Sequence, residues 1–439
     1  MMLSGWGRFP QQWCALHRPG SEDELRALLA QGPRIARGNG RGYGDCAMQR
    51  NATLEMRRFN RMLAFEDETG QLVTEAGVLL ADVIATFLPR GWFAPVTPGT
   101  KFVTIGGMVA ADVHGKNHHR DGTFGRFVDW IDLMGEDGEV RRCSPQENAE
   151  LFAWTIGGMG LTGVILRVAF RLRRVESAWI RQTTLPASNL DHVMTLFEEH
   201  ETATYSVAWI DCLNTGSSLG RSALMLGEHA HADELPRTRR AAPFSVPKKP
   251  TRTMPVDLPR AALNRMTVKA FNALYYRNAR AATGDKLVDW DSYFYPLDTI
   301  LEWNRIYGAR GFMQFQCVLP MDSARAGLDA LLRAITTSGS GSFLSVLKRM
   351  GAEHGPFSFP LEGYTLALDF PFSPEAAKLM GRLDAITLDH GGRFYLAKDA
   401  RMSAATLRRS DPRAETLAGM RRDGGMTNFR SSQSERLCL

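Results

Sequence analysis

RGNGRGYGD, residues 37–45, follows the short strand-like run RIAR and has glycine at every second position. Two more glycine-rich stretches follow, TPGTKFVTIGG at 97–107 and GGMGLTGVI at 157–165. Glycine tolerates positive φ and lets backbone amides approach an anion closely. A single stretch of this kind usually marks a turn, whereas three in one region predict a large phosphate-bearing ligand that is held by the backbone.

None of these stretches matches the two commonest nucleotide-binding loops. A Walker A loop is excluded because no Gly-Lys-Ser or Gly-Lys-Thr sequence follows the glycines. A standard dinucleotide-binding βαβ unit is excluded because no acidic residue ends a second strand at the required distance. The three loops therefore indicate a different kind of phosphate-binding domain.

The pattern of predicted elements changes near residue 175. Before it, short strands alternate with helices, the first of which occupies 21–32, with Ser21 as N-cap, Glu24 at the capping-box position and Gly32 at its end. After it, long strands alternate with helices, which predicts an α+β fold with helices on one face of an antiparallel sheet. The other expected elements are helices at 79–91, 263–280, 321–339 and 373–391, strands at 34–37, 52–56, 71–77, 179–186, 204–213, 310–320 and 363–372, a hairpin at 127–144 that turns at 136–138, and a helix, a glycine-rich turn and a strand in 147–175.

The composition is that of a soluble globular protein with two domains. Of the 439 residues, 44% are apolar and 23% are charged. The six cysteines form no C-x-x-C pair, which argues against a zinc ribbon or a disulfide framework and fits a reducing compartment. No signal peptide and no run of about 18 apolar residues is evident. We therefore expect a cytoplasmic protein that at most contacts the inner face of the membrane.

The order of these motifs resembles the vanillyl-alcohol-oxidase family, whose FAD-binding domain is of the PCMH type. More narrowly, RGNGRGYGD, TPGTKFVTIGGMVAADVHGKNHH, GGMGLTG, GFMQFQCVLP, SFLSVLK and FYLAKDAR occur in the order found in the decaprenylphosphoryl-β-D-ribose 2′-oxidase family. Together with the change in the pattern of predicted elements near residue 175, this resemblance implies a PCMH-type FAD-binding domain in 1–175 and a substrate-binding domain in 176–393. A C-terminal segment, 394–439, would return to the FAD domain.

The resemblance also implies how FAD is held. The first glycine-rich stretch would wrap the pyrophosphate, and the other two would line the rest of the cofactor. In several members of the wider family a histidine in the first stretch is bonded to the flavin; Arg41 stands there in this chain, so FAD should be noncovalent. The implied cofactor-binding residues are Arg37, Gly38, Asn39, Gly40, Arg41, Gly42, Tyr43, Gly44, Asp45, Thr97, Pro98, Gly99, Thr100, Gly106, Gly107, Ala110, His114, Gly115, Asn117, Gly157, Gly158, Gly160, Leu161, Thr162, Gly163, Val164 and Lys398.

The stretch DVHGKNHH, residues 112–119, holds three of the ten histidines. His114 and His118 have the i, i+4 spacing of zinc ligands on a helix, but Gly115 disfavours a helix and no Cys or Glu completes a ligand set. No metal site is therefore expected. Polar loop residues usually satisfy backbone groups or face water, which is the expectation for His118 and His119. The resemblance instead puts His114, Lys116 and Asn117 beside the flavin and the substrate.

Oxidation of an alcohol by a flavin requires a C–H over flavin N5 and a base for the hydroxyl proton. A histidine has a suitable pKa without perturbation, and a lysine only if burial or a neighbouring cation lowers its pKa. His114 is one candidate. Lys398 is the other, because the resemblance puts FYLAKDAR near the flavin and the sugar. The sequence does not choose between them.

Substrate contacts are expected from the second domain. Gln314 and Gln316 alternate along a strand, so both amides face one way and Phe315 the other, an arrangement that suits hydroxyl recognition. The resemblance adds Lys348 for the sugar phosphate, and Tyr43 and Lys116 for the sugar.

Two positions depart from the resembled family. Thr365 stands where the mycobacterial enzymes have an asparagine and Ala367 where they have a cysteine. The first change bears on fine sugar specificity. The second implies that a thiol-directed covalent inhibitor of that family has no target at this position.

Positive charge is concentrated between residues 236 and 280. This segment has eleven Lys or Arg and one acidic residue, hence ten net positive charges in a chain of net +6. Such runs are usually solvated surface, and 236–260 is expected to be a mobile loop. The functional alternative is that it covers the sugar pocket and, with the basic amphipathic segment 263–280, contacts an anionic membrane. General nucleic-acid binding is not expected.

The sequence thus predicts an FAD-dependent oxidoreductase that oxidises the 2-hydroxyl of a polyprenylphosphoryl-β-D-ribose to the keto sugar. A separate nicotinamide-dependent keto-sugar reductase would complete a ribose-to-arabinose epimerisation. One alternative is an alditol or aldonolactone oxidase that acts on free sugars and does not need the basic segment. Another is a membrane-surface electron-transfer flavoprotein without a sugar pocket. A metal-dependent hydrolase built on HGKNHH is a distant third.

Overall fold

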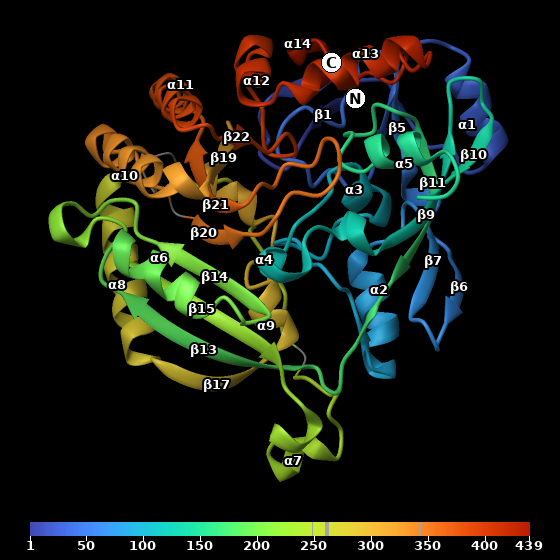
Figure 1. The fold of residues 1–439 in the computed structure, drawn as a ribbon. Helices are drawn as coiled ribbons and strands as arrows, with labels where there is room; N and C mark the ends of the chain where they lie inside the picture. The colour runs from blue at the N-terminus through green and yellow to red at the C-terminus, as the bar shows by residue number, and fades with distance from the viewer. Residues whose placement is uncertain (248, 260–262, 343) are drawn as a thin grey trace.

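The computed structural model describes residues 1–247, 249–259, 263–342 and 344–439 (Figure 1). Its amino-terminal part contains a parallel three-stranded sheet, ordered β3-β5-β4, and an antiparallel five-stranded sheet, ordered β10-β9-β11-β7-β6. The elements are β1 Met2–Ser4, β2 Gln11–Trp13, β3 Leu16–His17, α1 Glu22–Leu29, β4 Ile35–Arg37, β5 Thr53–Glu55, β6 Met62–Glu66, β7 Gln71–Glu75, α2 Leu80–Phe87, β8 Trp92–Phe93, α3 Ile105–Ala110, α4 His118–Asp121, β9 Val128–Met134, β10 Val140–Cys143, α5 Ala149–Thr155, β11 Val164–Arg171 and β12 Arg173–Arg174.

Local predictions in this part are largely confirmed. The side chain of Ser21 caps α1 by accepting the backbone N–H of Glu24. The Glu24 carboxylate accepts the N–H of Gly20 instead of the N–H of Ser21 that a capping box would use. The predicted hairpin is present as β9 and β10, with Val140 opposite Met134.

The second part is an eight-stranded antiparallel sheet ordered β17-β13-β15-β14-β20-β21-β19-β22, so the α+β prediction is confirmed. Strands β15, β17 and β20 and helix α6 were not predicted as elements. The elements are β13 Trp179–Ala187, α6 Leu190–Glu199, β14 Tyr205–Ile210, β15 Ser222–His229, α7 Arg237–Arg240, β16 Arg252–Thr253, α8 Arg265–Ala281, β17 Gly284–Asp289, α9 Trp290–Phe294, β18 Ile300–Leu301, the 3₁₀ helix η7 Trp303–Tyr307, β19 Phe312–Pro320, α10 Met321–Ser338, β20 Ser345–Met350, β21 Gly363–Pro371, α11 Pro374–Asp389 and β22 Arg393–Phe394.

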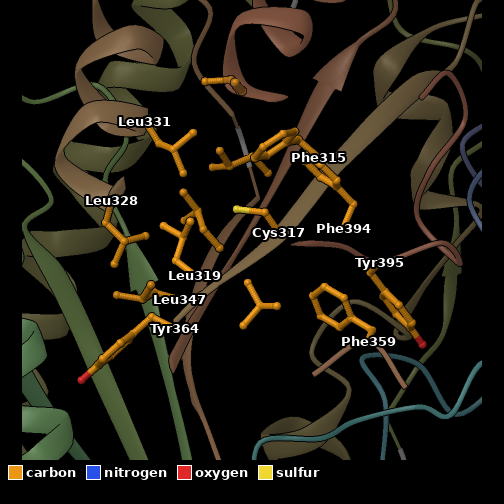
Figure 2. Close-up of a cluster of buried hydrophobic side chains, with 14 of the residues drawn as sticks. Phe315, Cys317, Leu319, Leu328, Leu331, Leu347, Phe359, Tyr364, Phe394 and Tyr395 are labelled. Carbon is orange, nitrogen blue, oxygen red and sulfur yellow. The ribbon is translucent and has the colours of Figure 1, made fainter. Parts of the chain in front are cut away.

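The alternation of β19 sets the orientation of this sheet. Phe315, Cys317 and Leu319 point into one apolar core, where Figure 2 shows them with Leu328 and Leu331 of α10. Side chains alternate across a strand, so the amides of Gln314 and Gln316 face the other way, as predicted.

The prediction that the helices cover one face of the sheet is wrong for α8. On β14, Ala208 belongs to the core that includes Phe197 of α6. Its neighbour Trp209 faces the opposite side, where its ring lies 4.5 Å from that of Tyr275 of α8. The basic amphipathic pattern identified α8 as a helix, but it could not say which face of the sheet the helix covers.

The chain ends beside the part in which it begins, and Figure 1 shows both termini next to the C-terminal helices. These helices are α12 Ala404–Ser410, α13 Arg413–Asp423 and α14 Ser432–Leu437. The N–H of Arg34 donates to the carbonyl of Asn428 at 2.8 Å, and the N–H of Ser432 donates to Met48 at 2.7 Å. The division at 175 and 393 remains a proposal, with these contacts in its favour.

The segment 236–260 contains regular structure in its described residues. Helix α7 lies at the end of a projection in Figure 1, and β16 pairs in parallel with β18. Lys249 forms an ion pair with Asp289, and Asp257 forms ion pairs with Arg8 and Arg305. Its mobility stays a prediction, and Lys248 and Arg260 lie outside the described residues. No helix in the described chain combines the length and apolarity needed to cross a bilayer.

Candidate active site

A cavity of about 460 Å³ lies between the glycine-rich loops and the eight-stranded sheet. The predicted residues that line it are Gly38, Asn39, Gly40, Arg41, Gly42, Tyr43, Thr97, Pro98, Gly99, Thr100, Gly106, Gly107, Ala110, His114, Gly115, Lys116, Gly160, Gly163, Gln314, Gln316, Lys348 and Lys398. The structure therefore brings together candidates that lie more than 350 residues apart in the chain.

The other predicted residues are not among those that line the cavity. Arg37 donates to the carbonyls of Ser4, at 2.7 Å, and Ala47, at 3.3 Å, and so supports the first loop from outside. Asn117 is fully buried and donates to Pro95 and Asp121. The remaining predicted residues outside the lining are Gly44, Asp45, Gly157, Gly158, Leu161, Thr162, Val164 and Thr365.

The loops have the features that a phosphate-bearing cofactor requires. Gly40 and Gly160 have φ of +65° and +76°, which disfavours any residue with a side chain. A Cβ on Gly99 would meet no atom within 4 Å, so space remains beside this backbone. Arg41 Nε and His114 Nδ1 are buried and have no hydrogen-bond partner in the described chain. These residues fit a ligand such as FAD, which carries both anionic and polar ring groups.

Two side chains, those of Thr365 and Gln316, determine which ring nitrogen of His114 carries the hydrogen. The Thr365 hydroxyl donates its hydrogen to the carbonyl of Cys317 at 2.8 Å, so Thr365 can only accept from Gln316. Gln316 Nε2 lies 3.3 Å from that hydroxyl oxygen and 3.1 Å from His114 Nε2. The amide NH₂ therefore faces both groups, and His114 Nε2 must accept.

The hydrogen of the His114 ring is consequently on Nδ1, which is buried and has no hydrogen-bond partner in the described chain, in a residue that lines the cavity. Burial, with Lys348, His118 and Lys398 adding to it, holds the pKa of His114 well below its usual range, so the ring is neutral. The rings of Tyr395 and Phe359 pack against it at 5.0 and 5.4 Å. His114 is thus held as a neutral hydrogen-bond donor.

Lys398, unlike His114, has an environment that suits a base. Its ammonium group lies 3.5 Å from the centroid of the Tyr43 ring. Burial lowers the pKa of Lys398, and the negative charge of Asp369 opposes that change. A buried lysine with a lowered pKa can accept a proton near neutral pH.

Two more lysines line the cavity. Lys348 on β20 is opposite Thr365, and burial lowers its pKa to about 8. Lys116 contacts the carbonyl of Tyr293, and burial lowers its pKa to about 7. Together they provide cationic groups that are suited to an anionic part of a substrate.

His118 and His119 lie outside the cavity and satisfy other groups, as expected. His118 Nδ1 accepts the N–H of Gly351 at 3.0 Å, and His119 Nε2 lies 2.8 Å from the carbonyl of Ala203. The prediction that this stretch is not helical is wrong at its end, because α4 begins at His118. Nowhere in the described residues do three or more His, Cys, Asp or Glu side chains gather as metal ligands would.

Sequence reasoning missed an apolar part of the cavity and the groups behind its wall. The apolar side chains are Val207, Trp209, Met225, Tyr275, Phe294, Leu297, Trp303, Leu344 and Val346. Asp369 and Tyr307, which contact each other behind Gln314, were also missed. The ALDF run gave no sign that its aspartate is buried. Cys46 lines the cavity as well, but burial raises the pKa of its thiol to about 12, which makes it unreactive.

Comparison with known proteins agrees with this geometry. The family described as an FAD binding domain matches residues 14–144. Decaprenylphosphoryl-beta-D-ribose oxidase of Mycolicibacterium smegmatis is 34% identical over 449 residues, which cover 100% of this chain and 97% of that protein. An uncharacterized protein from the mprA 5′ region of Streptomyces coelicolor is 31% identical over 72% of this chain and 87% of its own length.

A more distant match is L-gulonolactone oxidase of Bos taurus, which is 30% identical over 42% of each chain. The M. smegmatis protein, in contrast, is matched along almost its whole length. The chain belongs to the decaprenylphosphoryl-β-D-ribose oxidase family and is an FAD-dependent oxidoreductase.

Proposed function

We propose that this protein oxidises the 2-hydroxyl of a polyprenylphosphoryl-β-D-ribose to the 2-keto sugar. The observation that carries the proposal is a single cavity lined by cofactor-type glycine loops, two amides, three lysines and an apolar region. The amides suit the sugar hydroxyls, the lysines suit the phosphate, and the apolar region suits the isoprenoid chain. The name of the M. smegmatis relative supports the same substrate class.

FAD, when bound, supplies the hydride acceptor. The loop 38–43 and the glycines of 97–107 and 157–163 would hold its phosphates and ring. We propose noncovalent binding, because an arginine stands at position 41 and the nearby Cys46 thiol is not ionised. Denaturing the holoprotein with acid should release all of its yellow colour into the supernatant. Flavin that stays with the precipitate would contradict this proposal.

We assign separate roles in hydroxyl activation to several of the residues that line the cavity. Lys398, in its neutral form, takes the hydroxyl proton on Nζ. His114 donates its Nδ1–H to the sugar oxygen and is not the base, because its Nε2 lone pair is used by Gln316. Gln314 and Gln316 orient the sugar, and Lys348 and Lys116 bind the phosphate.

The test is an anaerobic titration that follows the flavin absorbance near about 450 nm, a property of the oxidised cofactor. A short-chain polyprenylphosphoryl ribose should bleach the flavin, and free ribose, alditols and aldonolactones should not. The matched control is the same lipid with 2-deoxyribose, which should bind without bleaching. Bleaching by free alditols or lactones would move the protein to the soluble sugar oxidases. Bleaching by none of them would favour the electron-transfer alternative.

The product is a keto sugar, so completing an epimerisation needs a second enzyme that reduces it. We propose a nicotinamide-dependent reductase for that step. Adding such a reductase with reduced nicotinamide and an electron acceptor should convert the ribose lipid to the arabinose lipid. Accumulation of the keto sugar alone would argue against this partner class.

We also propose contact with an anionic membrane through α8 and its surroundings. Met266 and Leu274 of α8 are 81% and 48% exposed, and Val256 and Ile300 are 57% and 40% exposed. The same helix carries four exposed basic side chains, Arg265, Lys269, Arg277 and Arg280. Apolar side chains among basic ones are typical of an interfacial helix.

Its test compares two surface variants in sedimentation with anionic liposomes. The double variant M266E/L274E should lose most of its binding, because it adds negative charge and removes apolar contact at once. The control L63E changes a leucine of similar exposure, 43%, on β6. Equal binding of both variants would rule out this surface. Deleting 238–258 is a less specific test, because it also removes the ion pairs of Lys249 and Asp257.

A further inference from the structure

Asp369 is a fully buried carboxylate directly behind the cavity wall. It lies on β21, two residues after Ala367, which lines the cavity. Its carboxylate accepts hydrogen bonds from Gln314 Nε2 and, at 3.3 Å, from the Tyr307 hydroxyl. No Lys, Arg or His of the described residues forms an ion pair with it. Burying an unpaired carboxylate is costly, so its presence needs a reason.

The basic residues of the cavity, Lys398 in particular, explain why a carboxylate is buried at this position. Lys398 lines the same cavity as Gln314, whose amide donates to Asp369. Burial raises the pKa of Asp369, and the Gln314 hydrogen bond and the charge of Lys398 oppose the rise. The groups that act on Lys398 are Asp369, which favours its charged form, Lys348, which disfavours it, and the Cys46 thiol. Tyr43 lies against the lysine, and its pKa is raised by burial and further by Asp369.

The charged residues that line the cavity are all basic. They are Arg41, Lys116, Lys348 and Lys398. When Lys398 takes the hydroxyl proton, the O–H bond breaks, the C–H electron pair leaves as hydride to the FAD, and the C–O bond becomes a carbonyl. The new ammonium then stands among three other cations, which would raise its energy unless a negative charge is close.

We infer that Asp369 is a positioning residue for this reaction: through its buried charge it stabilises the Lys398 ammonium, and through Gln314 it ties that charge to the sugar-binding amide. The inference rests on the proposed function in one respect, the assignment of Lys398 as base. It does not depend on which alcohol is the substrate, because any alcohol loses the same proton.

The test measures flavin reduction against pH in the holoenzyme with Asp369→Asn, which keeps the shape and removes the charge. The acid limb of the reduction rate reports the loss of the Lys398 proton. Without Asp369 the lysine loses its proton more easily, so the limb should move to lower pH by about one unit. Because the base becomes weaker, the plateau rate should also fall several-fold. Asp369→Glu, which restores the charge, should return the limb toward its wild-type position.

The matched control is Asp384→Asn, another buried aspartate, which pairs with Arg401 at 2.6 Å. It should lower the melting temperature and leave the limb unmoved. The inference would be overturned if the acid limb did not move in Asp369→Asn and if Asp369→Asn, like Asp384→Asn, changed only the stability of the protein.

Failure of the proposed substrate is distinguishable from failure of this inference. If a free alditol reduces the flavin and the lipid does not, the same pH comparison is made with the alditol. If neither reduces it, the flavin absorbance of wild type and Asp369→Asn is titrated with pH without substrate. A common titration curve for the two proteins would then count against the Asp369–Lys398 coupling.

Discussion

The two walls of the cavity differ in the residues that form them. The cofactor wall, residues 38–43, 97–107, 110–115 and 160–163, is rich in glycine. The sugar wall is made of side chains on β19, β20 and β21 and on the loop that carries Lys398, with Lys116 beside it. A backbone wall needs glycine at fixed positions and therefore leaves a visible motif. A side-chain wall depends on which strands meet and on how burial changes each ionisable group.

The two walls also bring different chemical groups to the cavity. His114, from the cofactor side, is held neutral with its acceptor nitrogen occupied by Gln316. Lys398, from the sugar side, is a buried amine whose pKa is lowered by burial. One of them can donate a hydrogen bond, and the other can take up a proton. The comparison is tested by changing one wall without the other.

The largest effect is expected for Lys398→Met, which removes the proposed base and leaves the cofactor wall intact. General base catalysis contributes about 10²–10⁴-fold, so flavin reduction should slow by about 10³-fold with FAD still bound. Because only neutral lysine can accept a proton, the wild-type rate should rise with pH through the Lys398 pKa. Stopped-flow reduction across pH checks both points. A variant that keeps the acid limb would return His114 to consideration as base.

The second prediction concerns the side chain that joins the two walls. Arg436 on α14 pairs with Asp45, next to the first glycine-rich loop, at 2.7 Å and with Asp399, next to Lys398, at 2.9 Å. Arg436→Gln leaves two largely buried carboxylates without their cation. We expect the free energy of unfolding to fall by about 3 kcal/mol, with weaker FAD retention.

Denaturant unfolding and flavin release on dilution measure these two effects. Arg333→Gln is the control, because Arg333 pairs with Asp329 on the exposed face of α10; its cost should be about 0.5 kcal/mol or less. Equal costs for the two arginine variants would mean that Arg436 does not hold the walls together.

The features that could be predicted from the sequence are those that depend on residues close together in the chain. The alternation of β19 predicted that Gln314 and Gln316 face together, and the cap at Ser21 predicted the start of α1. The pairing of Trp209 with Tyr275 could not be predicted, because it depends on α8 packing on the cavity side of the sheet. The choice between His114 and Lys398 required hydrogen bonds between two strands and a loop. Asp369 gave no signal, because an aspartate in a strand is usually exposed.

A smaller effect is expected for Lys348→Met, which removes a proposed phosphate contact on the sugar wall and no group that transfers a proton. KM for the lipid-linked sugar should rise about tenfold, the loss of one charge-assisted contact, with kcat changed little. The pKa of Lys348 lies at about 8 in the free protein. Its charge is therefore lost as pH rises through that value, and wild-type KM should increase on the alkaline side. Steady-state kinetics that show lower kcat at unchanged KM would place Lys348 in the chemical step.

The smallest effect, and the sharpest test of the contrast between the walls, is expected for Thr365→Val. The Thr365 hydroxyl orients the Gln316 amide by giving its hydrogen to the Cys317 carbonyl, and the amide in turn keeps the His114 hydrogen on Nδ1. Valine removes the orienting acceptor, so the amide can rotate and the Nε2–H form becomes accessible. Reduction should slow by a few-fold, about 1 kcal/mol for one neutral hydrogen bond.

The ring nitrogen shifts of ¹⁵N-labelled histidine separate the two tautomers directly. Wild type should show His114 protonated on Nδ1 alone, and Thr365→Val should show a mixture. Thr365→Ser, which keeps the hydroxyl, should behave as wild type. If wild-type His114 carried its hydrogen on Nε2, its unprotonated Nδ1 would be a second candidate base in a residue that lines the cavity. The cofactor wall would then share the proton transfer that we propose for Lys398.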